Sequence, residues 1–293
     1  MTDTRYDTPD LGAPVPDTHA HLDMLDDPAG ALVRAAQARV SFVATVVDVT
    51  ESPEATFEGL AGWLAEAEQR LAKEAASGDA TAAVDVPEVR IVVGCHPHNA
   101  SRYDEAVAAR LREFARDPRV AAIGEMGLDF HYDNSPRDEQ RAAFRAELAI
   151  AHESGLPAVV HLREAHDEGI DILTELGGPD AGCIIHCFTA DAELAARFVE
   201  MGCHISFAGP LTFKKAEELR VAAAAVPLER VLVETDCPFL APDPYRGRKN
   251  EPALVTYTAA ALARAHGVSE RACADALAAN ARVLLGQERV SGR

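Results

Sequence analysis

The sequence predicts a single-domain α/β protein of the (β/α)8 TIM-barrel class, on three observations. Short apolar segments alternate with longer amphipathic segments along the whole chain, which is typical of repeated β-α units and a parallel sheet. The chain has 293 residues, close to the roughly 250 residues of such a barrel. No GxGxxG motif follows the first apolar segment, which disfavours an open, dinucleotide-binding sheet.

Eight strands are expected, and several are nearly continuous β-branched runs, as suits strands covered on both faces. In chain order the expected strands are Val15–Ala20, Phe42–Val49, Arg90–Cys95, Val120–Met126, Ala158–Leu162, Cys183–Phe188, His204–Ala208 and Val231–Asp236. Helices are expected between them, for example at Glu139–Glu153 and Ala192–Met201. A last helix at Glu270–Leu285 follows Ser269, a residue type that caps helix starts.

The barrel is expected to span residues 14–287, between a flexible N-terminal tail at 1–13 and a C-terminal tail at 288–293. One segment departs from the regular alternation. Residues 66–88 are rich in alanine and charged residues and contain SGD and a late proline. We expect this segment to be a surface elaboration of the barrel, an extended helix followed by a loop, and not a second domain.

The composition restricts the compartment and the partners. The first residues are polar and acidic, without the apolar centre of a secretory signal, and no apolar run is long enough to span a bilayer. Six cysteines occur without a CxxC pair, which indicates reduced thiols in a cytoplasmic protein. The 48% hydrophobic content can fill a core, so no obligate protein partner is expected.

The formal net charge of −19 limits how this chain can bind a nucleic acid. Lys and Arg side chains normally neutralise the phosphates, and their contribution dominates non-specific affinity. A uniformly acidic body therefore predicts poor binding to long duplexes. A polyanionic substrate would have to be engaged locally, at an end, by metal ions and a few basic groups.

Side chains of the types that bind metals fall at the carboxyl ends of the expected strands. In a barrel these strand ends converge on one mouth, where active sites of this fold lie. Four histidines and two carboxylates in such places are hard to obtain by chance. They predict a metal site formed by His19 and His21 (in DTHAHLD), Glu125 (IGEMGLD), His161 (VVHLR), His186 (IIHCF) and Asp236 (VETDCPF).

The ligand types restrict the metal. Imidazole nitrogen and carboxylate oxygen suit Zn²⁺, Mn²⁺, Fe²⁺ or Co²⁺, and Mg²⁺ less well. Six ligands exceed the needs of one tetrahedral ion, so one or two divalent ions are expected, with Glu125 as the bridge. Two such ions against two carboxylates leave about +2 at the mouth. Strand alternation predicts that Cys95, Cys187 and Cys237, each next to a site residue, face away from the mouth.

Basic residues near the expected mouth indicate a phosphate-containing substrate. Arg163 follows His161 by two residues, and Arg246 lies in the basic loop YRGRKNEP after the last strand, where barrels often bind phosphate. His96, in the loop GCHPHN, is a candidate contact to the scissile phosphate or the leaving group. A divalent ion lowers the pKa of water towards neutrality, and Asp236 can accept the proton. Phosphodiester hydrolysis by a metal-activated water is therefore predicted.

Eight motifs together resemble those of the TatD-type metal-dependent deoxyribonuclease family, a branch of the amidohydrolase-like barrels. They occur in the order THAHLD, GCHPH, GEMGLDF, VVHLRE, IIHCF, ISFAG, ETDCPFLAP and YRGRKNEP. The resemblance runs from about residue 15 to residue 286 and implies a barrel with one or two metal ions. It further implies hydrolysis of DNA, as a 3′-5′ exonuclease on single strands, with RNA as a possible substrate.

The resemblance also implies ligand roles for the six predicted ligands and a role in substrate handling for His96. One departure from the family pattern is visible. The stretch between THAHLD and GCHPH is longer than usual because of residues 66–88.

Two other functions remain open at this point. The first is a small-molecule hydrolase that acts on an amide, ester or lactone with the same metal barrel. The basic loop YRGRKNEP favours the nuclease over this alternative. The second is a non-catalytic scaffold, which would be free to lose ligands. Every ligand motif is intact here, which favours an enzyme.

Overall fold

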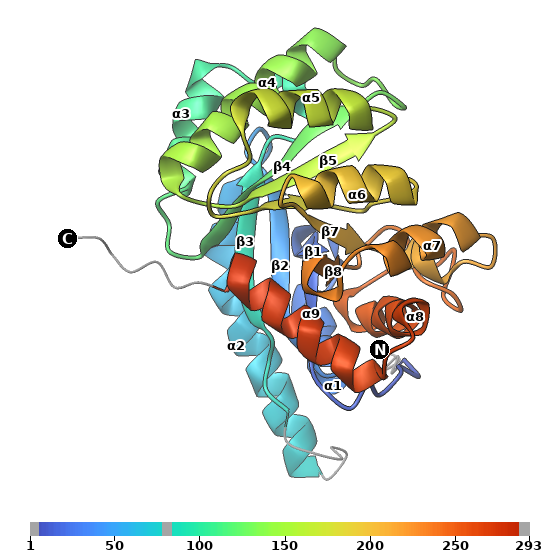
Figure 1. Cartoon of the computed structure of the whole chain (residues 1–293). Helices are drawn as coiled ribbons and strands as arrows, with labels where there is room; N and C mark the ends of the chain where they lie inside the picture. The colour runs from blue at the N-terminus through green and yellow to red at the C-terminus, as the bar shows by residue number, and fades with distance from the viewer. Residues whose placement is uncertain (1–5, 78–83, 287–293) are drawn as a thin grey trace.

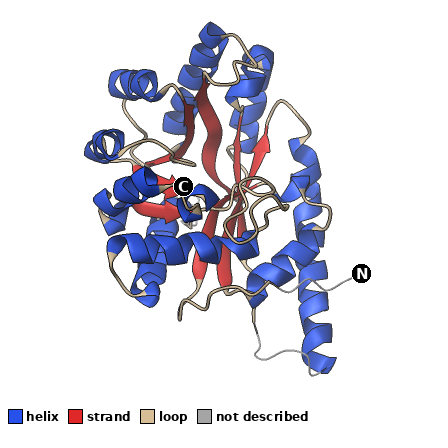
Figure 2. Ribbon diagram, turned by 90° about the vertical axis from the view of Figure 1, so that its right-hand side faces the viewer, coloured by secondary structure: helices blue, strands red, loops and turns tan. Residues whose placement is uncertain are grey.

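A ring of eight parallel strands surrounded by helices forms the protein, as a computed structural model of residues 6–77 and 84–286 shows (Figure 1). The strands pair in chain order, each parallel to the next, and the helices lie outside them (Figure 2). The strands are β1 Val15–Ala20, β2 Val40–Asp48, β3 Glu88–Gly94, β4 Val120–Asp129, β5 Ala158–Arg163, β6 Cys183–Ile185, β7 His204–Phe207 and β8 Val231–Val233. The predicted single-domain (β/α)8 barrel is confirmed.

Nine α-helices occur within the described residues, and none of them is long and apolar enough to cross a membrane. The helices are α1 Pro28–Gln37, α2 Pro53–Ser77, α3 Glu105–Phe114, α4 Arg137–Ser154, α5 His166–Leu176, α6 Ala192–Glu200, α7 Glu217–Ala225, α8 Val255–His266 and α9 Glu270–Leu285. Short 3-10 turns lie at Leu22–Met24, Pro97–Arg102, Gly209–Thr212, Leu228–Arg230 and Pro252–Leu254. Ser269 caps α9 as predicted, because its Oγ accepts the N–H of Ala272 at 3.2 Å.

Hydrogen bonds between β1 and the segment after β8 close the ring. The N–H of Asp236 donates to the carbonyl of His19, and the N–H of His21 donates to the carbonyl of Cys237, both at 2.9 Å. The first and the last predicted ligand motifs are therefore side by side.

Apolar side chains fill the inside of the barrel. Helix α9 closes the end opposite the mouth, which we call the lower end, and its buried apolar side chains form a plug there. One cluster contains Phe42, Ala44, Val46, Val92, Ala122, Val159, Ile184 and Leu232 together with Leu284 and Leu285 of α9. Side chains from strands on different sides of the ring can contact one another only in the interior of the barrel. Asn280 of α9 donates to the carbonyl of Val231 at the start of β8. The plug therefore lies at the amino-terminal ends of the strands, opposite the mouth.

Two strands end three residues before their predicted ends. β6 ends at Ile185 and β8 at Val233, whereas the sequence predicted strands as far as Phe188 and Asp236. Cys187 and Asp236 have φ values of 47° and 54°, a left-handed conformation that a strand does not contain. The chain therefore leaves the barrel wall before these residues, which lie on loops at the mouth.

The elaboration predicted at residues 66–88 is in part the second half of α2. This helix has 25 residues and is about 37 Å long at about 1.5 Å per residue, whereas the 9 residues of β2 span about 30 Å. It starts at the mouth end of β2 and runs back, so its excess length projects beyond the opposite end of the barrel (Figure 1). The helical part of the elaboration is therefore remote from the mouth. Residues 78–83 lie outside the described part.

Residues 6–13 pack against the barrel and do not form the flexible tail that was predicted for 1–13. Tyr6 makes an edge contact with Tyr245, with ring centroids 5.1 Å apart, and Leu11 and Ala13 are buried. The N-terminal segment therefore covers part of the loop after β8. Residues 1–5 and the C-terminal tail predicted at 288–293 lie outside the described residues.

Candidate metal centre

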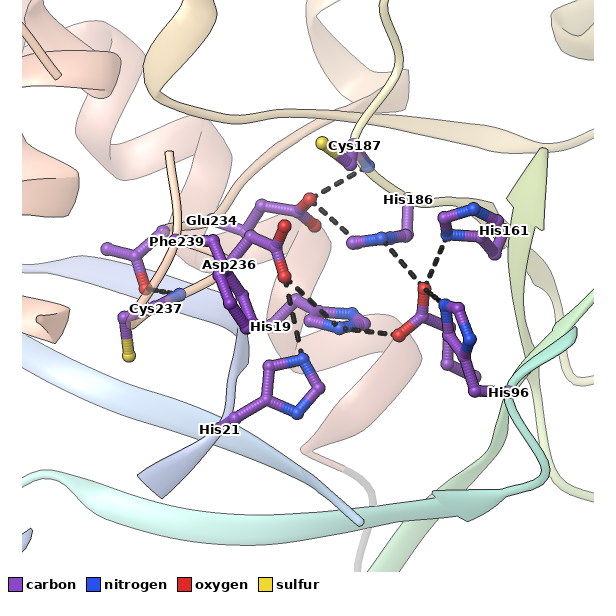
Figure 3. A network of polar contacts seen from close by, with 12 residues as sticks. His19, His21, His96, His161, His186, Cys187, Glu234, Asp236, Cys237 and Phe239 are labelled. Carbon is purple, nitrogen blue, oxygen red and sulfur yellow. Dashed lines mark hydrogen bonds and ion pairs between the residues drawn. The ribbon is translucent and has the colours of Figure 1, made fainter. Parts of the chain in front are cut away.

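One cavity at the mouth of the barrel brings most of the predicted site residues together. Its volume is about 760 Å³. The predicted residues that line it are His21, His96, Glu125, His161, Arg163, His186 and Asp236. His19 lies directly beneath, fully buried, with its ring stacked on that of His186 at a centroid distance of 3.8 Å. Figure 3 shows six of these side chains gathered around one centre, namely His19, His21, His96, His161, His186 and Asp236.

Glu125 is the centre of this arrangement. Its Oε1 lies 2.6 Å from Nδ1 of His161, 3.1 Å from Nε2 of His186 and 3.4 Å from Nε2 of His96, and its Oε2 lies 3.2 Å from Nε2 of His19. Burial alone would raise the pKa of Glu125, but the imidazoles of His186, His96 and His19 outweigh it and hold the pKa well below its usual range. A carboxylate that is ionised and surrounded by four imidazoles is suited to bridge two cations.

His21 and Asp236 form the other end of the group. Oδ1 of Asp236 lies 3.5 Å from Nε2 of His21 and 3.9 Å from Nε2 of His19. Burial opposes ionisation of Asp236, yet its hydrogen bond to His21 and the charge of His186 lower its pKa. Asp236 is therefore an ionised carboxylate in the interior of the mouth.

The residues present fit divalent cations. Ligand atoms of His19, His21 and Asp236 lie within 4.8 Å of one another. Oε1 of Glu125 lies 2.6 Å from Nδ1 of His161 and 3.1 Å from Nε2 of His186. His19 is fully buried, its Nδ1 has no hydrogen-bond partner, and its Nε2 faces only the carboxylates of Glu125 and Asp236. Buried polar groups are nearly always partnered, and a bond to a cation would give this imidazole its partner.

Glu234 is a site residue that the sequence reasoning missed. It is fully buried, and its Oε1 lies 2.8 Å from Nδ1 of His186. The same carboxylate accepts the N–H of Cys187 at 2.7 Å and the hydroxyl of Ser206 at 2.6 Å. A histidine that ligates a metal commonly donates its other N–H to a carboxylate. The signal in the sequence was the carboxylate two residues before Asp236 in VETD.

Asp129 plays the same part for two other histidines. Its Oδ2 lies 2.9 Å from Nε2 of His98 and 3.3 Å from Nε2 of His161. Its Oδ1 accepts the N–H groups of His131 and Tyr132. Asp129 is the last residue of β4 and lies in the motif GLDF. Its position at a strand end was the available signal.

Strand alternation predicted that Cys187 faces away from the mouth, and this prediction is wrong. It lines the cavity, and its sulfur lies within 4.8 Å of ligand atoms of His186 and Asp236. The prediction failed because β6 ends at Ile185 and the left-handed φ of Cys187 redirects its side chain. Cys95 and Cys237 are buried, as predicted.

The basic residues divide into two groups. Arg163 lines the cavity, with its guanidinium 4.8 Å from the ring centroid of Tyr132. Arg246 is not among the lining residues, and its guanidinium packs 4.3 Å from the ring centroid of Phe213. Lys249 of the same loop pairs with Asp26 at 2.6 Å. Substrate binding by Arg246 stays a prediction.

The mouth is more acidic than the sequence-based estimate of about +2. Six carboxylates line the cavity, namely Asp23, Asp48, Glu51, Glu125, Asp129 and Asp236. In the part of the chain that the structure describes, Arg163 is the only Arg or Lys among the lining residues. The estimate counted two carboxylates only, because no site residue was predicted at Asp48, which ends β2, or at Asp129, which ends β4 four residues after Glu125.

A barrel with histidines and carboxylates gathered at its mouth is the architecture of a metal-dependent hydrolase. A family model described as TatD related DNase matches residues 16–286. The chain therefore belongs to the TatD-related DNase family, as the motifs predicted.

Similar proteins from other organisms support this family assignment. The uncharacterised metal-dependent hydrolase TatD of Mycobacterium tuberculosis is 36% identical over 257 residues, which are 84% of this chain and 88% of the relative. A protein of Klebsiella pneumoniae named 3′-5′ ssDNA/RNA exonuclease TatD is 37% identical over 198 residues, 66% of this chain and 75% of the relative.

A solved structure supports the fold. The crystal structure of YjjV, a TatD homologue from Escherichia coli, superposes with a TM-score of 0.78 at 25% identity and covers 93% of this chain and 98% of its own. The prediction of a metal-dependent hydrolase with divalent metal cofactors is confirmed.

Proposed function

We propose that this chain hydrolyses phosphodiester bonds of single-stranded DNA from the 3′ end, and that RNA is an alternative substrate. The observation that carries the proposal is that five of the six predicted ligands line one cavity and that the sixth, His19, lies directly beneath it, in contact with Glu125. The ligand set is His19, His21, Glu125, His161, His186 and Asp236. The Klebsiella relative, named as a 3′-5′ exonuclease of single-stranded DNA and RNA, supports the substrate and the polarity.

The charge of the cavity supports a local mode of binding. A mouth lined by six carboxylates and Arg163 repels a phosphate unless cations fill it. Divalent ions held by the predicted ligands would offset this negative charge, and the chemistry that they would supply is the activation of a water for attack. Arg163, at the rim, adds one donor for a phosphate oxygen. The substrate is therefore held at its end, and the acidic body of the protein keeps the rest of a long strand at a distance.

Asp236 and His96 have complementary tasks in this reaction. Asp236 is held ionised, so its carboxylate orients the attacking water and accepts its proton. Nδ1 of His96 accepts the backbone N–H of His98 at 3.1 Å, which leaves the ring proton on Nε2. That N–H points at the side of the cavity where Glu125 lies, 3.4 Å away. It donates a hydrogen bond to a phosphate oxygen or to the leaving oxygen.

A cytoplasmic location belongs to the same proposal. Six cysteines are free thiols, which suits a reducing compartment. Cell fractionation with an antibody to the chain tests this location, and recovery in the periplasm or the medium would contradict it.

The decisive experiment is a time course on single-stranded DNA with Mn²⁺, Mg²⁺, Zn²⁺ or Co²⁺ and an EDTA control. A 5′ label should give a ladder that shortens one nucleotide at a time, and a 3′ label should be released as a mononucleotide at once. RNA of the same sequence and a panel of esters, amides and lactones run in parallel. Cleavage of the panel without cleavage of either oligonucleotide would refute the proposal.

A further inference from the structure

Exposed apolar side chains gather at the mouth of the barrel. Among the described residues, eight large apolar side chains are exposed, and four of them line the cavity: Met24, Tyr132, Phe239 and Leu240. The two aromatic members, Tyr132 and Phe239, are 54% and 52% exposed. Exposed rings at a site otherwise lined by carboxylates and histidines are costly in water, which indicates a binding role.

The two rings stand at opposite ends of the candidate metal centre. A row of seven rings crosses the mouth, each centroid within 6.5 Å of the next, in the order Phe239, His21, His19, His186, His161, His98 and Tyr132. Figure 3 shows Phe239 beside His21 at one side of the group and His161 and His96 at the other. A phosphate at the centre of this row therefore has one aromatic ring on each side.

Both rings are held in place through their backbones. The N–H of Tyr132 donates to Oδ1 of Asp129 at 2.9 Å. The N–H of Phe239 donates to the carbonyl of Asp236, and its own carbonyl accepts from Asn250 at 2.7 Å. The segments that carry the exposed rings are thus fixed to the metal site. Preorganised aromatic groups bind with little loss of conformational entropy.

Aromatic rings beside a phosphate site fit unpaired nucleobases. Stacking on an aromatic side chain is tolerant of sequence, because every base has a flat face. The guanidinium of Arg163, 4.8 Å from the ring centroid of Tyr132, extends this platform with a second flat group. Paired bases inside a duplex cannot reach such rings without being unstacked.

We propose that Tyr132 and Phe239 are base-stacking platforms that bind the nucleobases on either side of the scissile phosphate. The inference rests on the proposed nuclease function and adds the groups that select a single strand. The metal centre holds the phosphate, and the two rings hold its flanking bases. A duplex end must therefore fray before it is bound.

Paired changes in enzyme and substrate test this assignment. The enzymes are wild type, Tyr132→Ala and Phe239→Ala, with Tyr132→Phe and Phe239→Tyr as conservative variants. The substrates are a short single strand and its versions with an abasic site at the last or the next-to-last nucleotide. Val221→Ala and Leu176→Ala remove exposed apolar side chains of α7 and α5 that do not line the cavity.

Each alanine variant should raise KM for the intact strand about 5- to 150-fold, the range expected for loss of one stacked base. The conservative and control variants should stay within about twofold of wild type. One abasic site should raise KM for wild type by a similar factor and add little more in the matching alanine variant, since the partner ring is already gone. Equal abasic penalties in wild type and alanine variants would overturn the assignment.

A binding measurement separates this inference from the proposed function. A phosphorothioate-linked strand with 2-aminopurine next to its end resists cleavage and reports stacking through loss of fluorescence. Wild type loaded with Mn²⁺ should quench it, and the alanine variant of the ring that it contacts should not. Quenching without cleavage of any nucleic acid refutes the nuclease and keeps the platforms. Cleavage without quenching refutes the platforms and keeps the nuclease.

Discussion

The two ends of the barrel are built from the same eight strands but have opposite characters. At the lower end, α9 seals the interior with apolar side chains such as Leu284, and Asn280 donates to two carbonyl groups near the start of β8. At the mouth, the buried His19 has an Nδ1 without a hydrogen-bond partner, and Cys187 and Asp236 have left-handed backbones. The lower end holds the fold together. The mouth carries costs that stability alone would not select.

The largest effect on activity is expected from replacing one carboxylate oxygen of Asp236 by an amide nitrogen. Asp236→Asn keeps the shape of the side chain but removes its ability to accept a proton, so kcat should fall about 10²- to 10⁴-fold, with a small change in KM. His161→Ala should instead lower the metal content and impair both constants. Kinetics and metal content are measured on the same samples.

The matched control for this change is Asp171→Asn, which alters an exposed carboxylate of α5 and should leave kcat unchanged. If Asp236→Asn with its metal bound keeps more than about a tenth of the wild-type kcat, general-base assistance by Asp236 is wrong.

A smaller loss is expected from Glu234, which does not line the cavity and contacts two residues that do, His186 and Cys187. Glu234→Gln weakens the hydrogen bond that orients this imidazole, and metal affinity should fall about 10- to 100-fold. Competition with a fluorescent chelator measures the affinity, and saturating metal should restore most of kcat. Glu193→Gln, on the exposed face of α6, is the control. Unchanged affinity would mean that His186 is oriented by its other contacts.

A substitution at the lower end should change the free energy of unfolding and leave kcat unchanged. Leu284→Ala removes a buried side chain from the α9 plug and should lower the free energy of unfolding by about 2–5 kcal/mol. Below the unfolding transition, kcat and metal content should match wild type. Leu176→Ala, an exposed leucine, should cost less than about 0.5 kcal/mol. A drop in kcat for folded Leu284→Ala would show that the two ends are coupled.

The smallest effect concerns a buried glutamate just behind the mouth. Glu147 of α4 accepts the N–H of Cys95 at 2.7 Å, and its other oxygen has no hydrogen-bond partner. Burial raises the pKa of Glu147 well above its usual value, the reverse of Glu125. The folded protein therefore favours the protonated form. Its contribution to stability is complete below the unfolded pKa of about 4.3 and is lost as pH rises towards the folded pKa.

Glu147→Gln is neutral at every pH and keeps an oxygen for the N–H of Cys95. The variant should therefore gain stability relative to wild type as pH rises, by up to about 1.4 kcal/mol per pH unit above about pH 5. Denaturant unfolding at several pH values measures the difference. A difference that does not change with pH would show that Glu147 is not protonated in the fold.

Local patterns were enough to predict the barrel and six candidate ligands that gather at its mouth. The alternation of apolar segments predicted eight strands, and the first of them, Val15–Ala20, has the predicted bounds. The candidate ligands could be recognised because each lies in the second half of a strand or within three residues after it, for example Glu125 in β4 and His161 in β5. Strand ends meet at one mouth in every parallel barrel, so position along the chain was sufficient.

The partners of these ligands were not predictable in the same way. Glu234 contacts His186, and Asp129 contacts His98 and His161. These residues come from different strands, so the local sequence does not indicate which carboxylate faces which imidazole. The orientation of Cys187 depends on a single φ angle after β6. The basic loop illustrates the same limit, since Arg246 stacks on Phe213 outside the cavity.

The sequence by itself determined the class of fold, the chemistry of the ligand set and the kind of ion it suits, because these depend on periodicity and on residue type. Only the tertiary structure decided which carboxylates surround the site, where Arg163 lies, and that Tyr132 and Phe239 stand at its two ends. The physical reason is distance along the chain. Interactions between neighbours in sequence leave a pattern, whereas contacts between loops from different strands arise only when the barrel closes.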